Sequence, residues 1–552
     1  MSAANNHAAA EASAATNDQA AGRGPPPGAA GPGETRETRG MAWLPWAAGY
    51  LAAAIVLFLC YLRISETVTV TSDGAGIALQ AWDMLHGNVL LHGWGLADVT
   101  FYTTEIPEYA LVEIFRGLGP ADVHICAAIT YTLLVVLAGL LAKGNKTGKE
   151  GLVRVLIASG VMIAPQIGPG AFVLLLSPDH TGTSVPLLLI FLLLDRAPRR
   201  WWVPAAVGLM LAWTQIGDSL VAAIGAAPIV VVCGVRAYRG IVQGGEPVSV
   251  HWFDLALAVS AVVSVAVADA AVKIIGSLGG YTMATLDTVV ARSASWAAHV
   301  SLTVDGLLHL YGAGLISGSL RFATGIAAVH LVGVALAAWA TGRVIRRFFA
   351  CDDMIAQILA VAIAVNVTAY AFSRLPTVLY ASHEIAPVLP FGAVLAGRML
   401  AERLARAKLL PALTAAACVY LAALAYGASL TPTPLRDQAL INWLGAHHLT
   451  TGLGSYAEGD NIGLASHGTI LIAVPEFHPA SVDHRRLFLE KTSDFDPRQH
   501  NANFVVSTTE DGPSFHVPPA FAIRAFGRPA RTYHYGPWTI MTWNKNLLYE
   551  IR

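Results

Sequence analysis

Between residues 41 and 430 the chain alternates long apolar runs with short charged loops. A helix needs about 20 apolar residues to cross the hydrocarbon core of a bilayer, and most of these runs reach that length. Over the whole chain, 55% of the residues are hydrophobic and only 13% are charged, whereas soluble domains carry about 25% charged residues. The sequence therefore predicts a polytopic α-helical membrane protein and excludes an ordinary soluble enzyme.

Eleven of these runs are predicted to cross the membrane. The runs at 183–195 and 386–397 are short, so their helices must include flanking residues to span the membrane. Pro165 and Pro169 interrupt the third run, so a broken or kinked helix is expected there. The eleven runs are 43–62, 121–142, 152–176, 183–195, 201–217, 219–235, 253–275, 322–342, 354–373, 386–397 and 409–429.

Basic residues are distributed unequally between the two sets of loops. Alternate loops, beginning with the one after residue 142, carry fifteen Lys and Arg residues, and the longer loops of the other set carry five. Because basic loops stay on the cytoplasmic side, the N-terminus is predicted in the cytoplasm and the C-terminal segment outside. The composition, rich in Ala, Gly, Pro and Arg, is typical of a high-GC bacterium and indicates a bacterial cytoplasmic membrane.

Composition divides the chain into three parts. Residues 1–40 are rich in Ala, Gly and Pro and lack apolar periodicity, so they are expected to form a disordered cytoplasmic tail. Residues 41–430 form the helical membrane domain, with outer loops at 63–120 and 276–321. Residues 431–552 hold eight of the eighteen histidines, and a small extracytoplasmic α/β domain is expected there. Its expected elements are a helix at 434–449, strands at 470–474 and 503–507, and a hairpin of 532–535 with 538–543.

The first outer loop places an acidic residue shortly after the first apolar run. Asp73 precedes an amphipathic helix at 74–85, which is expected to lie along the membrane surface. A partly desolvated carboxylate at the rim of an outward cavity suits a general base toward an acceptor hydroxyl. The alternative is that Asp73 caps the helix, and this is the simpler interpretation of Ser72 and Asp73 taken alone.

Two short outer turns carry further polar residues. Asp179 and His180 lie in a turn at 177–183, and Asp218 separates two apolar runs with hardly any loop. These side chains can bind a sugar or a cation, whereas turn and capping chemistry explains each of them alone. An acidic outer vestibule is predicted where they join Asp73, Asp98, Glu105 and Glu108.

This layout resembles the GT-C superfamily of membrane glycosyltransferases, which transfer sugars from polyprenyl-phosphate carriers. The similarity rests on one crossing, an acidic residue in a long first outer loop, and an amphipathic helix that ends in Leu-His-Gly-Asn at 85–88. Many members carry two adjacent acids at this position, whereas Gly74 follows Asp73 here. The resemblance implies an inverting hexosyl or pentosyl transfer to a cell-envelope glycan or protein, in which Asp73 deprotonates the acceptor and the lipid phosphate leaves.

A leaving lipid phosphate needs cationic or hydrogen-bonding partners near the outer rim. The resemblance makes Arg374, Lys273 and His383 the candidates, and Glu384, next to His383, is also expected to bind substrate. Lys273 follows Asp269 by four residues in an apolar helix, so the two can instead form a structural pair that fixes the rotation of that helix. For Arg374 and Lys273, snorkelling to the membrane interface is the other interpretation.

The sequence contains no motif for several other kinds of catalytic or binding site. It has no Gly-rich phosphate loop, no Ser/His/Asp signature, no zinc-ligand spacing and no basic patch with interleaved aromatic residues. We therefore predict no set of metal ligands and no nucleic-acid partner, while an acidic vestibule is compatible with a divalent cation as cofactor. The expected partners are the polyprenyl-phosphate-linked sugar donor, the acceptor and the lipid bilayer. Two other functions stay open: a transporter or flippase for a lipid or glycan, and a non-catalytic scaffold of the same fold.

Overall fold

The computed structural model describes residues 44–284, 290–314, 322–406, 409–478, 481–483, 489–508 and 517–551. The tail predicted at 1–40 lies outside the described residues. Residues 53–552 form one compact unit, which contains both the membrane helices and the C-terminal segment.

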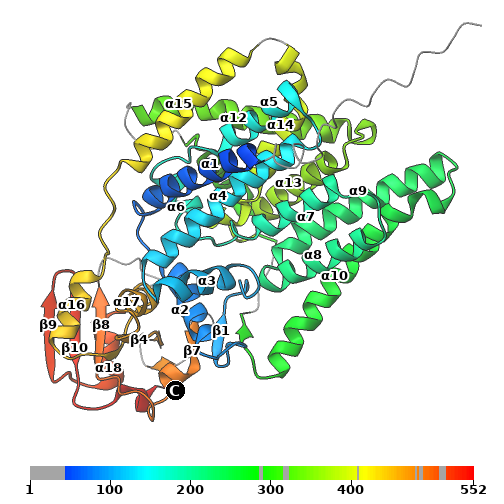
Figure 1. Ribbon diagram of the computed structural model, residues 1–552. Helices are drawn as coiled ribbons and strands as arrows, with labels where there is room; N and C mark the ends of the chain where they lie inside the picture. Colours follow the sequence, from blue (N-terminus) through cyan, green and yellow to red (C-terminus); the bar gives the residue numbers. More distant parts are fainter. Residues whose placement is uncertain are drawn as a thin grey trace, which may run out of the picture. The chain divides into compact units, whose positions relative to one another are not determined.

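Eight helices among the described residues are long and apolar enough to cross a membrane. Three shorter helices, α5 (Gly148–Met162), α7 (Ser184–Arg196) and α8 (Trp202–Gly217), occupy the remaining predicted runs. The eight long spans contain α1 (Leu44–Ser65), α4 (Ala121–Lys143), α9 (Ala227–Tyr238), α10 (Trp252–Ser277), α12 (Phe322–Arg346), α13 (Met354–Phe372), α14 (Val388–Arg406) and α15 (Leu410–Ala428) (Figure 1). The predicted polytopic helical membrane fold is confirmed.

The third predicted run is broken, as its prolines indicate. Helix α5 ends at Met162, and the short helix α6 (Pro169–Leu174) begins with its proline in the first turn, where a missing N–H breaks no helical hydrogen bond. The short run at 386–397 is lengthened in both directions, since the 3-10 helix η6 (Tyr380–Ile385) precedes α14 and α14 continues to Arg406.

Helices α4 and α14 lie inside the bundle, whereas α10 and α15 lie on its outside. The spans that contain α4 and α14 are 72% and 83% buried, and those that contain α10 and α15 are each 22% buried. Helix α4 packs against α5, α7 and α14, and the large side chains of the core include Tyr131, Phe191 and Phe391. The outer helices remain apolar because lipid, and not water, is the solvent around them.

The first outer loop folds against the C-terminal segment. Helix α2 (Ser72–Leu85) packs on α3 (Glu105–Arg116) and on α17 (Gly459–Ala465). The apolar face expected at the membrane surface is therefore covered by protein, and Ile77 and Ala81 are buried in a cluster that includes side chains of α3 and α17. This differs from the expectation for 74–85, because hydropathy does not distinguish a lipid-facing side chain from a protein-facing one.

A small three-stranded sheet connects both outer loops to the C-terminal segment. Strand β1 (Trp94–Leu96) runs parallel to β2 (Thr282–Met283) and antiparallel to β7 (Glu490–Lys491). Helix α11 (Trp296–Leu310) follows in the second outer loop and packs against α13 and η6. These contacts hold the outer segments over one end of the helix bundle.

The C-terminal segment is built on a five-stranded mixed sheet with the strand order β4-β3-β8-β10-β9 (Figure 1). Strands β9 (Arg531–Tyr535) and β10 (Trp538–Thr542) form the predicted hairpin, and Gly536 adopts φ +56° in its turn. Strand β3 pairs in parallel with β4 and β8, so the segment is of the α/β type. Its other elements are α16 (Gln438–Ala446), β3 (Thr451–Leu453), β4 (Leu471–Ala473), β5 (Glu476–Phe477), β6 (Val482–Asp483), β8 (Phe504–Thr508) and α18 (Pro519–Phe526).

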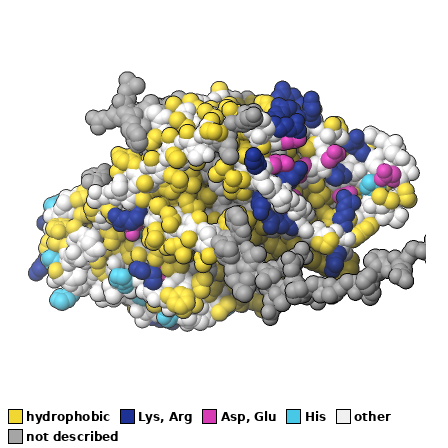
Figure 2. Space-filling view, turned by 45° about the horizontal axis from the view of Figure 1, so that its top comes forward, with side chains coloured by type: hydrophobic (Ala, Val, Ile, Leu, Met, Phe, Trp, Pro, Cys, Tyr) yellow, Lys and Arg dark blue, Asp and Glu magenta, His cyan; other side chains and the backbone are white. Residues whose placement is uncertain are grey.

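At the other end of the bundle, Arg398 holds three loops together. Its guanidinium contacts Asp195 at 2.6 Å and Asp353 at 2.9 Å, and it donates to the carbonyl of Leu141 at 2.7 Å. These partners lie at the ends of α7 and α4 and just before α13, next to loops that the charge pattern predicts on one side. Figure 2 shows Lys and Arg side chains gathered on one part of the surface, with a few Asp and Glu side chains among them.

Candidate active site

Asp73 lies in the first turn of α2 and accepts hydrogen bonds from two tyrosines. The Tyr456 hydroxyl donates to its Oδ1, and the Tyr380 hydroxyl lies 3.4 Å from its Oδ2. The Ser72 hydroxyl donates to the backbone carbonyl of Tyr456 at 2.5 Å, which fixes the same loop to the start of α2. The helix begins after Thr71, and no described side chain caps it. Asp73 is thus an oriented carboxylate and not the helix cap.

Gly74, the residue after Asp73, packs closely against its neighbours. A Cβ atom here would lie 3.0 Å from Cγ1 of Val123 and 3.2 Å from Cβ of Ser177. Both distances are shorter than ordinary van der Waals contact. Helix α2 therefore approaches α4 and the 177–183 turn closely at Gly74, and a side chain here requires Val123 and Ser177 to shift.

Asp179 stands next to Asp73 across the Tyr380 hydroxyl. This hydroxyl lies 3.2 Å from Oδ2 of Asp179, and the Ser177 hydroxyl donates to the same oxygen at 2.7 Å. Burial, followed by the repulsion of the nearby Asp73 carboxylate, raises the pKa of Asp179 to about 6. The Tyr380 hydroxyl has one proton and can donate it to only one carboxylate at a time. The hydrogen bonding of Asp73 therefore depends on that of Asp179.

His180 is the cation at the centre of the site. Its Nδ1 lies 3.0 Å from Oδ2 of Asp218, and its Nε2 lies 3.5 Å from Oε1 of Glu384. Burial alone lowers the pKa of His180, but Glu384 and Asp218 outweigh that effect and raise it to about 10. The imidazole is therefore protonated at neutral pH and bridges two carboxylates.

Glu105 lies behind this cluster. It is fully buried, and the Thr183 hydroxyl lies 3.4 Å from its Oε1 and 2.8 Å from Oδ2 of Asp218. Burial, together with the repulsion of Asp218, raises the pKa of Glu105 well above its ordinary value. Burial thus disfavours the charged form of Glu105 behind the cluster.

One group of side chains has the geometry of a cation site. His180, His383 and Glu384 each offer one ligand atom, and these atoms lie within 4.8 Å of one another. The two imidazole rings are stacked, with their centroids 5.0 Å apart. Two imidazoles and one carboxylate are donors that suit a divalent transition metal with open coordination positions, so the residues fit such an ion in the form in which His180 has lost its ring proton.

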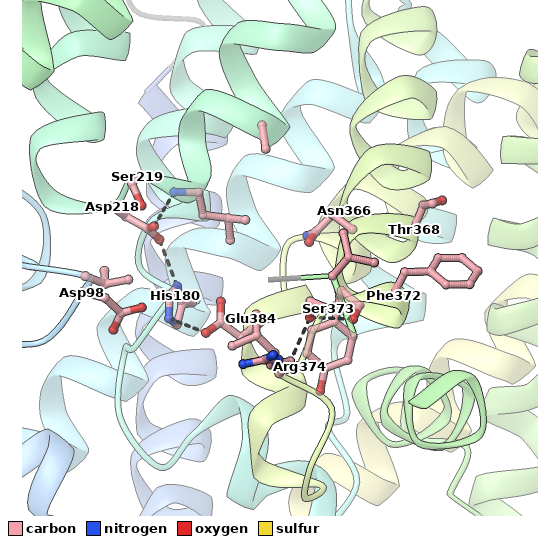
Figure 3. Close-up of a pocket in the computed structure, with 17 residues that line it drawn as sticks. Asp98, His180, Asp218, Ser219, Asn366, Thr368, Phe372, Ser373, Arg374 and Glu384 are labelled. Atoms are coloured by element: carbon pink, nitrogen blue, oxygen red, sulfur yellow. Dashed lines mark hydrogen bonds and ion pairs between the residues drawn. The ribbon is translucent and has the colours of Figure 1, made fainter. Parts of the chain in front are cut away.

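Two cavities meet at this cluster. The smaller one, about 190 Å³, contains Asp73 and Asp179, and the larger one, about 540 Å³, is mostly apolar and contains Arg374. The larger cavity lies between η1 (Ala222–Ala226) and the end of α13, and Figure 3 shows its labelled residues around His180 and Arg374. The residues that line both cavities are Asp98, Val99, His180 and Glu384.

The structure brings most of the predicted site residues together. Asp73, Asp98, Asp179, His180, Asp218, Arg374, His383 and Glu384 line one or both cavities. Glu105 lies behind them. Lys273 does not join them: it is exposed on α10, pairs with Asp269 at 2.7 Å and lines neither cavity.

Sequence reasoning missed three side chains of the site. Tyr380 and Tyr456 contact Asp73, and Thr183 contacts Asp218. A hydroxyl side chain in a loop belongs to no sequence motif with a fixed spacing, so the sequence does not identify it as part of a site. Thr183 and Tyr380 lie within a few residues of predicted site residues, whereas nothing in the sequence near Tyr456 points to Asp73.

No protein-family model and no curated protein sequence matches this chain. Solved structures do match it. The apo structure of ArnT from Cupriavidus metallidurans is 12% identical, with a TM-score of 0.53, over 93% of this chain and 99% of ArnT. The chain has the GT-C fold. A second ArnT structure, bound to undecaprenyl phosphate, matches with a TM-score of 0.51 and 11% identity over 91% of this chain and 98% of ArnT.

The oligosaccharyltransferase AglB from Archaeoglobus fulgidus, in complex with an inhibitory peptide and a dolichol-phosphate, also matches. It is 13% identical, with a TM-score of 0.45, over 85% of this chain and 70% of AglB. The ArnT matches extend over almost the whole of both chains, so the GT-C fold includes the C-terminal segment as well as the helix bundle.

Proposed function

We propose that this chain is a membrane glycosyltransferase that moves a hexose or pentose from a polyprenyl-phosphate carrier to an extracytoplasmic acceptor. One observation carries the proposal: an acidic cavity that holds Asp73 adjoins a mostly apolar cavity that holds Arg374, and His180 and Glu384 stand in the wall they share. The solved ArnT structure of the same fold contains undecaprenyl phosphate.

The larger cavity suits the end of a lipid-linked donor. Its lining is mostly apolar, with side chains such as Leu220, Ala223 and Phe372 that can contact an isoprenoid chain. Arg374 is the only Lys or Arg among the described residues that line either cavity, and its guanidinium can bind phosphate with two hydrogen bonds. The phosphate would then lie between Arg374 and the His180 cation.

The smaller cavity suits the acceptor and the base. In the proposed transfer, Asp73 takes the proton of the acceptor hydroxyl while the acceptor oxygen bonds to the anomeric carbon of the sugar. The bond between that carbon and the phosphate oxygen breaks on the opposite face, and the electron pair leaves with the lipid phosphate. Attack and departure on opposite faces invert the anomeric centre.

The charged cluster at the shared wall supports the departing phosphate. His180, protonated and held by Asp218 and Glu384, places a fixed positive charge where negative charge develops. A divalent cation would need the deprotonated form of His180; held by that imidazole with His383 and Glu384, it would replace the imidazolium charge and supply Lewis-acid stabilisation. Asp218 and Thr183 keep the His180 ring oriented.

The proposed location is a bacterial cytoplasmic membrane with the N-terminus in the cytoplasm. The site and residues 431–552 then face outward, and 1–40 form the cytoplasmic tail. The helix ends joined by Arg398 lie at the opposite end, next to loops of the set that carries fifteen of the twenty loop Lys and Arg residues, which supports this orientation. The transporter alternative depends on Asp269 and Lys273, and these two residues line neither cavity.

Transfer in reconstituted vesicles tests the proposal. Labelled polyprenyl-phosphate monosaccharides are offered to the full chain with a cell-envelope fraction as acceptor, and the Asp73→Asn variant is compared with wild type. The matched control is Asp269→Asn, which removes an equal charge from an exposed pair away from both cavities. Transfer that is lost in Asp73→Asn and kept in Asp269→Asn is expected.

Two results would contradict the proposal in different ways. Unchanged transfer in Asp73→Asn would show that Asp73 is not the base, although the protein would still be a glycosyltransferase. No transfer and no donor binding by wild type, with every donor of the panel, would favour the scaffold function.

A further inference from the structure

The end of the bundle away from Asp73 has a hollow that the proposed transfer does not use. Its volume is about 380 Å³, and it is lined by Trp339, Arg343, Arg346 and Arg347. These residues follow one another at intervals of four, three and one along the end of α12. Trp339, Arg343 and Arg346 share one face of α12, and Arg347 follows directly after the helix, so three guanidinium groups and an indole ring surround one space.

A neighbouring helix adds a fourth cation. The guanidinium carbon of Arg403, on α14, lies 5.7 Å from the centroid of the Trp339 ring, and that of Arg343 lies 5.5 Å from the same ring. Both distances are within the range of cation–π contact. The half-buried indole thus holds arginines from two helices beside the hollow.

These arginines have no carboxylate partner among the described residues. Arg346 donates to the Gly342 carbonyl of its own helix at 3.2 Å, and Glu402, the acid beside Arg403 in sequence, pairs with Arg406 instead. At the same end of the bundle, Arg398 contacts two aspartates. The three guanidinium groups that line the hollow and the one beside it repel one another, and a bound anion would offset this repulsion.

The position of the hollow at the end of a membrane span indicates which molecule provides such an anion. Residues Gly325–Arg346 form a candidate membrane span, so Arg346 and Arg347 stand where that span ends. Tryptophan and arginine are favoured at the headgroup level of a bilayer, where phosphate groups are concentrated. Basic pockets between membrane helices bind the headgroups of anionic lipids.

We propose that Trp339, Arg343, Arg346, Arg347 and Arg403 form a binding site for the phosphate of an anionic phospholipid headgroup. The guanidinium forks bind the phosphate oxygens, and the acyl chains extend along the lipid-facing side of α12. The site lies at the opposite end of the helices from the proposed active site and does not depend on the proposed transfer.

Lipid titration of the full-length protein in neutral detergent, followed by native mass spectrometry, tests this site. The probes are phosphatidylglycerol, phosphatidylcholine and inorganic phosphate. The test variant is Arg346→Gln/Arg347→Gln, and the control is Lys149→Gln/Arg200→Gln, which removes the same charge from exposed residues outside the hollow. At about 1 kcal/mol for each basic residue near anionic lipid, the test variant should bind phosphatidylglycerol roughly thirtyfold more weakly.

The expected pattern has three parts: wild type and the control prefer phosphatidylglycerol to phosphatidylcholine, the test variant loses that preference, and inorganic phosphate does not compete at equal concentration. Equal binding by the test and control variants would overturn the site. If inorganic phosphate bound as tightly as phosphatidylglycerol, the hollow would be a site for a soluble anion, and the proposal of a lipid ligand would be wrong. A melting temperature of the test variant in lipid-free detergent within a few degrees of wild type shows that the variant is folded.

Discussion

Tyr456, in the C-terminal segment, donates its hydroxyl proton to Oδ1 of Asp73, which precedes it by 383 residues. The same loop accepts a hydrogen bond from Ser72 at the Tyr456 carbonyl, and α17 packs against α2 just beyond it. The C-terminal segment therefore completes the surroundings of the proposed base. Tyr380 approaches the other carboxylate oxygen from the helix bundle, so two distant parts of the chain orient one side chain.

Removing the Tyr456 hydroxyl should slow transfer while leaving the fold intact. In Tyr456→Phe the ring remains, but Asp73 loses a charge-assisted hydrogen bond worth about 1.5–3 kcal/mol. We expect kcat to fall by about tenfold to a hundredfold, with little change in KM for the donor, because Tyr456 does not line the larger cavity. Steady-state kinetics in vesicles measures both constants. Tyr535→Phe, on an exposed strand of the same segment, is the control, and an equal loss there would indicate a general effect on the C-terminal segment.

The His180 cation should make stability depend on pH. Its pKa in the folded protein, about 10, lies above the ordinary 6.5. Protonation of His180 therefore stabilises the folded state fully below pH 6.5, and this contribution is lost as the pH rises toward 10. We expect the melting temperature of the detergent-solubilised protein to fall across this range. His180→Gln should show a smaller fall, whereas the exposed control His534→Gln should behave like wild type. Parallel curves for all three proteins would mean that His180 is neutral in the folded state.

The sequence predicts the helix bundle well, because each membrane helix is encoded locally. Pro165 and Pro169 indicate even the break between α5 and α6. Helix α3 is not predicted, and its burial pattern explains why. Glu105 and Glu113 face inward and are buried, whereas Ile114 is 62% and Phe115 81% exposed. Ile106 and Tyr109 of the same helix are also buried, so apolar side chains lie on both faces and hydropathy gives no clue to which face lies inside.

The candidate site could be predicted only in part. Asp73, Asp179 and Asp218 each follow or precede an apolar run on the same predicted side, so their meeting at one end of the bundle follows from the count of crossings. Which of them share a hydrogen bond does not follow, because Tyr380 reaches Asp73 and Asp179 through the tertiary fold. Lys273 is an example of the opposite error. A charged residue in an apolar helix suggests a functional role, but Lys273 lies exposed and pairs with Asp269.

A side chain at position 74 should destabilise the fold. An alanine Cβ would lie 3.0 Å from Val123 and 3.2 Å from Ser177, and overpacking of this kind costs about 1–3 kcal/mol. We expect Gly74→Ala to lower the melting temperature and Gly74→Asp to lower it further, without any gain in transfer from the second acid. Gly160→Ala is the matched control, since its Cβ would meet no atom within 4 Å and helical alanine is favoured. A Gly74→Asp variant that is stable and more active would show that the close approach of α2 to α4 is not required.

Arg374 should determine the affinity for the donor. Its guanidinium is exposed at the larger cavity and has no ion pair with a described residue, so it is available to a phosphate group. In Arg374→Gln the loss of a charge-assisted contact should raise KM for the polyprenyl-phosphate sugar by about tenfold to a hundredfold. Arg374→Lys should recover part of this loss, because the charge returns without the bidentate geometry. Arg292→Gln, an exposed arginine of the second outer loop that lines neither cavity, is the control. If Arg374→Gln kept the donor KM of wild type, the phosphate would have to bind at the His180 side of the shared wall, and the larger cavity would hold the lipid chain alone.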